Sequence, residues 1–136
     1  MKILLFFAKE FWSSPYARVL PEAEPPEGPI CLKEAVVVFY HLEAEDIGRE
    51  SSLISKMVKN IKWLAGKFGV KAVLLHSFNH LSSSKAPPDL AVKIIPLVKE
   101  RLERVGFIVK ETPFGYLNEW KIHVAGESLA KVFKEL

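Results

Sequence analysis

The chain has 136 residues, 49% of them hydrophobic, which is enough to bury the core of one compact domain and too little for two. Its formal net charge is +3, from 19 basic and 16 acidic side chains, so the surface is mixed and only mildly basic, which permits a polyanionic partner. A single cysteine, Cys31, excludes an intramolecular disulfide and a cysteine-rich zinc site.

The N-terminal part combines a strand with a proline-rich segment. Residues 2–8 are apolar on both faces, which predicts a central strand of a covered sheet. No apolar run reaches the roughly 18 residues that a transmembrane helix needs, so we expect a soluble protein with no membrane partner. The single cysteine is consistent with the reducing cytoplasm, where we expect the protein to be. Residues 13–33 are rich in proline and glutamate, which predicts an extended, mobile excursion. We expect its aromatic side chains, Phe11, Trp12 and Tyr16, to pack on the body more readily than to cover a pocket.

The strongest strand and helix patterns follow in the middle of the chain. Residues 34–43 are β-branched and aromatic, which is typical of a buried strand. Apolar side chains then recur at helical spacing, in a helix that Ser51 or Ser52 caps and Gly69 ends. Its lysines occupy the other face, which we interpret as solvated.

The last third of the chain predicts a second helix, two strands and a final helix. The second helix runs from Leu90 to Val105, and Pro96 inside it predicts a kink or a break. Strands are predicted at 107–109 and 117–125, and a helix capped by Ser128 is predicted from there to Leu136.

The order β, loop, β, α, β, α, β, β, α predicts an α/β fold, in which one sheet is packed against two main helices and a short C-terminal helix. No internal repeat is present. We therefore expect residues 1–136 to form one domain, and the abrupt end of the last helix indicates a domain taken from a longer chain.

Chemistry-capable side chains concentrate where one predicted strand ends. The apolar run from Lys71 leads into a polar cluster of two histidines, an asparagine and three serines that ends at Ser84. The Pro-Phe-Gly-Tyr turn that ends at Tyr116 precedes another strand, and its glycine, Gly115, permits close backbone approach to a ligand. We expect the two segments to meet. His80 is the strongest candidate for orienting a substrate or titrating near neutrality; the alternative is a histidine that bonds the neighbouring loop.

Other site chemistries fit the sequence less well. His76 and His80 are four residues apart, but the glutamate and the helix of a zinc motif are missing, so we expect no metal. Nor does the chain contain a glycine-rich phosphate loop or a Gly-x-Ser-x-Gly elbow, and we expect no nucleotide cofactor. A serine nucleophile among residues 82–84 is disfavoured, because serine runs of this kind usually cap a following helix and face solvent. His41 and His123 lie in strand-like runs and are interpreted as structural or surface residues.

Taken together, these segments resemble the N-terminal editing domain of archaeal threonyl-tRNA synthetases, which is similar in fold to D-aminoacyl-tRNA deacylases. The resemblance covers most of the chain and is most specific in two motifs, His-Leu-Ser-Ser from His80 and Pro-Phe-Gly-Tyr from Pro113. The Ser-Gln-Phe-Thr-Leu and Gly-Pro-Val-Thr runs that are typical of the D-aminoacyl deacylases are absent.

The resemblance implies hydrolysis of the ester of L-seryl-tRNA(Thr). A pocket that must separate serine from threonine by one methyl group gains only about 10- to 200-fold discrimination, which makes a second, hydrolytic site necessary. The family also implies a homodimer, a water positioned with help from the 2′-hydroxyl of the terminal adenosine, and oxyanion stabilisation by backbone amides. It further implies that the amino acid is held by backbone groups beside the histidine and the Pro-Phe-Gly turn. The substrate-binding residues implied are Leu42, Asn79, His80, Phe114, Gly115 and Tyr116.

The chain departs from the family pattern at three positions. Leu117 and Asn118 stand where the family has tyrosine and lysine, and Lys131 stands where it has glutamate. Lys121 cannot replace the missing lysine, because three residues along a strand turn a side chain to the opposite face. We expect His80 and Asn118 at the catalytic positions, with proton transfer that depends more on the substrate hydroxyl and backbone donors than on side chains.

The sequence leaves other readings open. One is a D-aminoacyl-tRNA deacylase, and another is a tRNA-binding or assembly domain that lost its activity along with the lysine and glutamate. The expected partners are seryl-tRNA(Thr), bound through phosphate contacts by lysines such as Lys85 and Lys93, and a synthetase catalytic domain that is either fused or separate.

Overall fold

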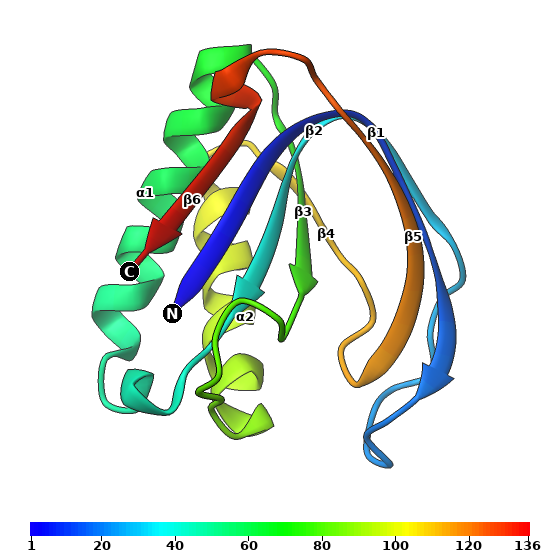
Figure 1. Ribbon diagram of the computed structural model, residues 1–136, viewed down its shortest axis with the longest axis vertical. Helices are drawn as coiled ribbons and strands as arrows, with labels where there is room; N and C mark the ends of the chain where they lie inside the picture. The colour runs from blue at the N-terminus through cyan, green and yellow to red at the C-terminus, as the bar shows by residue number, and fades with distance from the viewer.

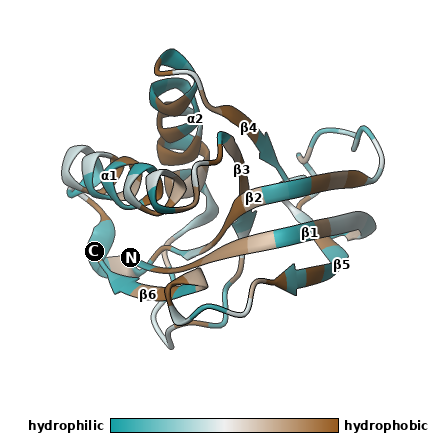
Figure 2. Ribbon diagram, turned by 90° about the horizontal axis from the view of Figure 1, so that it is seen from above, coloured by the Kyte–Doolittle hydropathy of each residue, from teal (hydrophilic) through white to brown (hydrophobic).

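The computed structural model describes residues 1–136 and contains one mixed six-stranded sheet with both α-helices on one side of it (Figure 1, Figure 2). Strand order is β4-β3-β2-β1-β5, and β6 also pairs with β1. The elements in chain order are β1 (Lys2–Arg18), β2 (Ile30–His41), α1 (Glu50–Phe68), β3 (Ala72–Ser77), α2 (Pro88–Arg104), β4 (Ile108–Glu111), β5 (Tyr116–Val124) and β6 (Lys131–Glu135).

The parallel part of the sheet is built from two crossovers. Strands β2, β3 and β4 are parallel neighbours, with α1 between the first two and α2 between the last two along the chain. The apolar stripes of both helices pack on the sheet and form a core of 23 buried residues. Gly69 ends α1 in the left-handed conformation (φ 65°) and donates its N–H to Ala65 O, as the helix-stop pattern predicts. Neither helix is long and apolar enough to cross a membrane.

Helix α2 is assigned without interruption, so the break predicted at Pro96 is wrong. Pro96 and Val92, whose carbonyl loses its helical donor to the proline, both lie on the exposed side of the helix. Water can therefore satisfy that carbonyl while the buried side of α2 keeps its packing.

Strand β1 is much longer than the predicted strand at 2–8, and the predicted excursion at 13–33 is correspondingly too long. β1 pairs with β2 from Lys2 to Ser13, with β6 along Lys2–Phe6 and with β5 from Ala8 to Arg18. Only residues 19–29 lie outside the strands. Pro15 lies at a register shift between β1 and β5, where the loss of a ladder donor is tolerated.

The C-terminal helix predicted from Ser128 is wrong, although the α/β class is confirmed. Ser128–Ala130 forms a short 3-10 turn, and the chain then continues as β6 along the edge of β1. Leu4 pairs with Phe133, and Leu136 N–H donates to Met1 O at 2.8 Å. Nine residues are too few for helical spacing to outweigh an available strand edge.

Candidate active site

A pocket of about 320 Å³ lies where β3 and β5 approach the loop between β1 and β2. It contains no lysine, arginine, aspartate or glutamate among its lining residues. The two segments expected to meet do so, since Thr112 N–H donates to Leu75 O at 3.1 Å. All seven site residues named from the sequence line this pocket: Leu42, Asn79, His80, Phe114, Gly115, Tyr116 and Asn118.

The polar cluster after β3 is held by its neighbour in the sheet. Phe78 N–H extends the parallel pairing by donating to Tyr40 O at 2.9 Å, and His80 N–H then turns back to Phe78 O at 2.9 Å. Leu42 O accepts from Ala86 N–H at 3.0 Å, so the loop closes over the end of β2. Two of the implied backbone groups, the His80 N–H and the Leu42 carbonyl, are thus already bonded within the protein.

His41 fixes the loop that carries His80. Its side chain is fully buried, Nδ1 accepts from Leu81 N–H at 3.1 Å, and Nε2 lies 2.7 Å from Ser84 O. Because Nδ1 is an acceptor, the ring proton is on Nε2, which donates to Ser84 O. The structural role expected for His41 is therefore its observed one, whereas His123 lies exposed on β5, outside the pocket.

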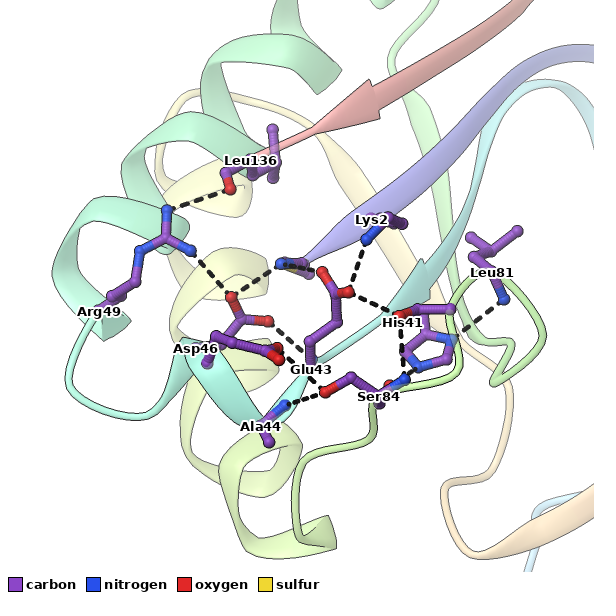
Figure 3. Close-up of polar contacts among 12 residues, drawn as sticks. Lys2, His41, Glu43, Ala44, Asp46, Arg49, Leu81, Ser84 and Leu136 are labelled. Atoms are coloured by element: carbon purple, nitrogen blue, oxygen red, sulfur yellow. Dashed lines mark hydrogen bonds and ion pairs between the residues drawn. The ribbon is translucent and has the colours of Figure 1, made fainter.

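Glu43 anchors the same loop from the other side (Figure 3). Its carboxylate accepts from Lys2 Nζ at 2.5 Å, from Ser82 Oγ at 2.6 Å and from the Met1 α-ammonium at 3.0 Å. The hydrogen bond from Lys2, followed by that from Ser82, lowers the pKa of Glu43 to about 2. Ser82 Oγ also accepts from Ser84 N–H at 3.1 Å, so this hydroxyl holds the loop in shape.

His80 itself is exposed at the rim of the pocket. Its ring meets Phe78 edge-on, with centroids 4.9 Å apart, and its side chain makes no hydrogen bond to the protein. The alternative of a histidine that bonds the neighbouring loop thus describes His41 and not His80. The imidazole of His80 is available to a ligand.

The Pro-Phe-Gly turn is fastened to the loop between β1 and β2. Gly115 O accepts from Val19 N–H at 2.8 Å and from Leu20 N–H at 3.1 Å. Gly115 has φ +83°, and a Cβ on it would lie 2.8 Å from Ala23 Cβ. Only glycine fits here, and Val19 and Leu20 consequently line the pocket, a role that the composition of the loop did not reveal.

Asn118 occupies the family's lysine position in the pocket wall. Its Nδ2 donates to Tyr116 O at 3.2 Å, while Oδ1 is sealed from solvent and has no partner in the protein. The ammonium of Lys121 lies over the Trp12 ring, 5.2 Å from its centroid, and Lys121 does not line the pocket. Lys131 donates to three carbonyls of its own turn, at 3.0 to 3.3 Å, and also lies outside the pocket.

Several lining residues were not singled out from the sequence as site residues. His76 and Thr112 are buried and bonded to each other, with Nδ1 and Oγ1 2.9 Å apart, and Trp120 stands beside them. A histidine on an apolar strand carries no local pattern that separates a pocket residue from a core residue.

Comparisons with known proteins agree with this fold. In the solved structure titled c-Myc DNA Unwinding Element Binding Protein, 99% of the chain superposes on 100% of this one with a TM-score of 0.66 at 13% sequence identity. This similarity concerns the fold alone, which the two proteins share over their whole length. Residues 1–136 match the family described as the archaea-specific editing domain of threonyl-tRNA synthetase, and the chain belongs to that family.

Curated relatives are considerably longer than this chain. Threonine–tRNA ligase of Hyperthermus butylicus is 29% identical over 138 residues, which cover 97% of this chain and 22% of the relative. The ligase of Thermococcus onnurineus is 34% identical over 105 residues, which cover 77% of this chain and 17% of the relative. The chain therefore spans about a fifth of the length of these ligases.

Proposed function

We propose that this domain hydrolyses the ester of L-seryl-tRNA(Thr) and spares L-threonyl-tRNA(Thr). The observation that carries the proposal is the meeting of the His80 segment and the Pro-Phe-Gly turn in one uncharged pocket, in a chain of the editing-domain family. An uncharged pocket with a mixed polar and apolar lining suits a small amino acid ester, and it offers no cation for a nucleotide phosphate.

Backbone donors are available for the chemistry. The amide N–H groups of Asn79, Phe114 and Gly115 donate to no acceptor within the protein. An ester carbonyl that becomes a tetrahedral oxyanion needs such fixed donors, which stabilise charge as it develops. His80, free of protein hydrogen bonds, would orient the attacking water or the terminal ribose, whose 2′-hydroxyl would help to position that water.

Asn118 takes a defined part in this proposal. Its sealed, unpartnered Oδ1 is an acceptor that lacks a donor, and the substrate's α-ammonium or the reacting water supplies one. Asn118 cannot transfer a proton as a lysine can, so proton movement falls to the water and the substrate hydroxyl. We expect Asn118→Ala to slow hydrolysis about 10- to 100-fold and Asn118→Lys to restore or exceed the wild-type rate.

The test is to incubate the domain with L-seryl-tRNA(Thr), L-threonyl-tRNA(Thr) and a D-aminoacyl-tRNA, and to follow loss of each ester against buffer. Rapid loss of serine alone supports the proposal, whereas loss of the D-aminoacyl ester alone would replace it with D-aminoacyl deacylation. His80→Ala should be slow, and His123→Ala, which alters an exposed histidine outside the pocket, should match wild type.

A non-catalytic tRNA-binding domain is the second candidate. It is favoured because Asn118 stands where the family has lysine and Lys131 stands where the family has glutamate. Tight, salt-sensitive tRNA binding without ester loss would establish it. In either case the partners we propose are tRNA(Thr) in the cytoplasm and a threonyl-tRNA synthetase catalytic domain, fused or separate.

We also propose a homodimer, formed through the face of the sheet opposite the helices. A small buried cluster lies on that face, flanked by partly buried apolar side chains that no helix covers: Leu4, Phe6, Ile30, Leu32, Phe78 and Ile122. Sedimentation equilibrium would show a single monomer species if this proposal is wrong.

A further inference from the structure

His76 is a polar group set among aromatic rings at the inner side of the pocket. His76 belongs to β3, and its side chain lies beside the small buried cluster on the sheet face opposite the helices. The residue is only 4% exposed. Its ring centroid lies 4.8 Å from that of Phe39, 6.0 Å from that of Trp120 and 6.2 Å from that of Phe78. Apart from Thr112, the His76 side chain makes no hydrogen bond with the protein. A structural core position of this kind would ordinarily be filled by another aromatic ring.

One nitrogen of the His76 ring has no hydrogen-bond partner in the protein. Nδ1 is 2.9 Å from Thr112 Oγ1, and Nε2 has no protein partner. Asn118 Oδ1 is the only side-chain polar atom in the structure that is both sealed from solvent and unpartnered. His76 Nε2 is therefore not sealed from solvent, and the His76 side chain lines the pocket together with Thr112.

His76, paired with Thr112, presents a neutral ring nitrogen that can act either as a hydrogen-bond donor or as an acceptor. Burial lowers the pKa of His76 to about 4, so the ring is uncharged near neutral pH. If the Thr112 hydroxyl donates to Nδ1, Nε2 carries the proton and donates; if Thr112 accepts from Nδ1, Nε2 accepts. A hydroxyl group, which also both donates and accepts, is the matching partner. An ammonium is a poorer match, because it only donates hydrogen bonds and so fits only one of the two states of Nε2.

Building on the proposed function, we propose that His76, supported by Thr112, recognises the side-chain hydroxyl of the amino acid carried by the tRNA. The hydroxyl of a seryl group forms a hydrogen bond with His76 Nε2, whereas an alanyl group has no hydroxyl and leaves Nε2 without a partner among the aromatic rings. Sites built to bond a hydroxyl reject analogues that lack it, since the buried polar group then loses its partner. His76 is in this sense a specificity residue, separate from the groups that act on the ester.

The test uses amide analogues of 3′-seryl- and 3′-alanyl-adenosine, in which NH replaces the ester oxygen so that binding is measured without hydrolysis. Isothermal titration should show that the wild-type domain binds the seryl analogue about tenfold or more tightly than the alanyl one. His76→Phe, which keeps a ring among the aromatic side chains, should bring the two affinities within about threefold, chiefly by weakening the seryl analogue. Thr112→Val should give an intermediate ratio.

The outcomes separate this inference from the proposed function. An unchanged ratio in folded His76→Phe, or equal binding by wild type, overturns the role of His76 even if seryl-tRNA is hydrolysed. If the ratio of the seryl and alanyl affinities depends on His76 but the domain hydrolyses no ester, the recognition role of His76 is supported and the catalytic proposal is wrong. Failure of wild type to bind either analogue overturns the role of His76, and loss of the ester from seryl-tRNA(Thr) then decides the proposed function separately. Thermal denaturation of each variant shows whether the fold is retained, and the Thr112→Val ratio decides if His76→Phe does not fold.

Discussion

Acid should destabilise the wild-type domain more than a His76→Phe variant, within a defined range of pH. The unfolded chain binds a proton at His76 near pH 6.5, whereas burial lowers the pKa of the folded state to about 4. Between these values the unfolded state binds more protons than the folded state, so the free energy of unfolding falls as pH falls. The loss levels off below pH 4. At 1.36 kcal/mol per pH unit it amounts to about 3 kcal/mol.

Urea denaturation at pH 7, 5.5 and 4.5, followed by far-ultraviolet circular dichroism, measures this effect. His76→Phe loses the bond to Thr112 at every pH, so its stability curve is offset, but the acid-dependent loss from His76 disappears. The difference between the two proteins should shrink or reverse as pH falls. Curves that stay parallel from pH 7 to 4.5 would refute the reasoning. His123→Phe, at an exposed position, serves as the matched control.

Three further substitutions test the framework of the site. Gly115→Ala places a Cβ 2.8 Å from Ala23 Cβ at a positive φ, and should cost about 1–3 kcal/mol in urea denaturation; an unchanged stability would contradict the geometry. His41→Phe leaves Leu81 N–H without its acceptor, so ester hydrolysis should drop although His41 does not line the pocket; a wild-type rate would show that the loop holds itself. Glu43 has a pKa of about 2 in the folded state, so its contribution is present above pH 4.5 and lost as pH falls toward 2; Glu43→Gln should lack this loss in acid titration.

Local patterns predicted the covered part of the sheet well, because there the packing follows the chain. The strand at 34–43 and the helix that ends at Gly69 bury the faces that their apolar spacing indicates. The segment after Ser128 was predicted as a helix because its apolar residues recur at helical spacing. Its true partner is the edge of β1, far away in sequence, and no local pattern contains that information.

The site divides in the same way. His80 and Gly115 belong to compact local motifs that singled them out in the sequence, and the structure places both in one pocket. Leu20 enters the pocket only because Gly115 O binds the loop that carries it. His76 is indistinguishable in sequence from a core histidine. Its accessible nitrogen emerges only once the neighbouring rings are in place.

The sharing of β1 among three strands affects how the domain folds. Lys2 pairs with Glu135 and Ala8 with Val124, so the first strand of this domain completes its pairing only with strands from the domain's last third. Contacts so distant in sequence slow folding, because a long loop must close before they form. Until the region after residue 116 leaves the ribosome, one edge of an apolar strand stays unpaired and open to association with other chains. We expect chains interrupted before that point to aggregate, and the full domain to depend on rapid release or on chaperones during synthesis.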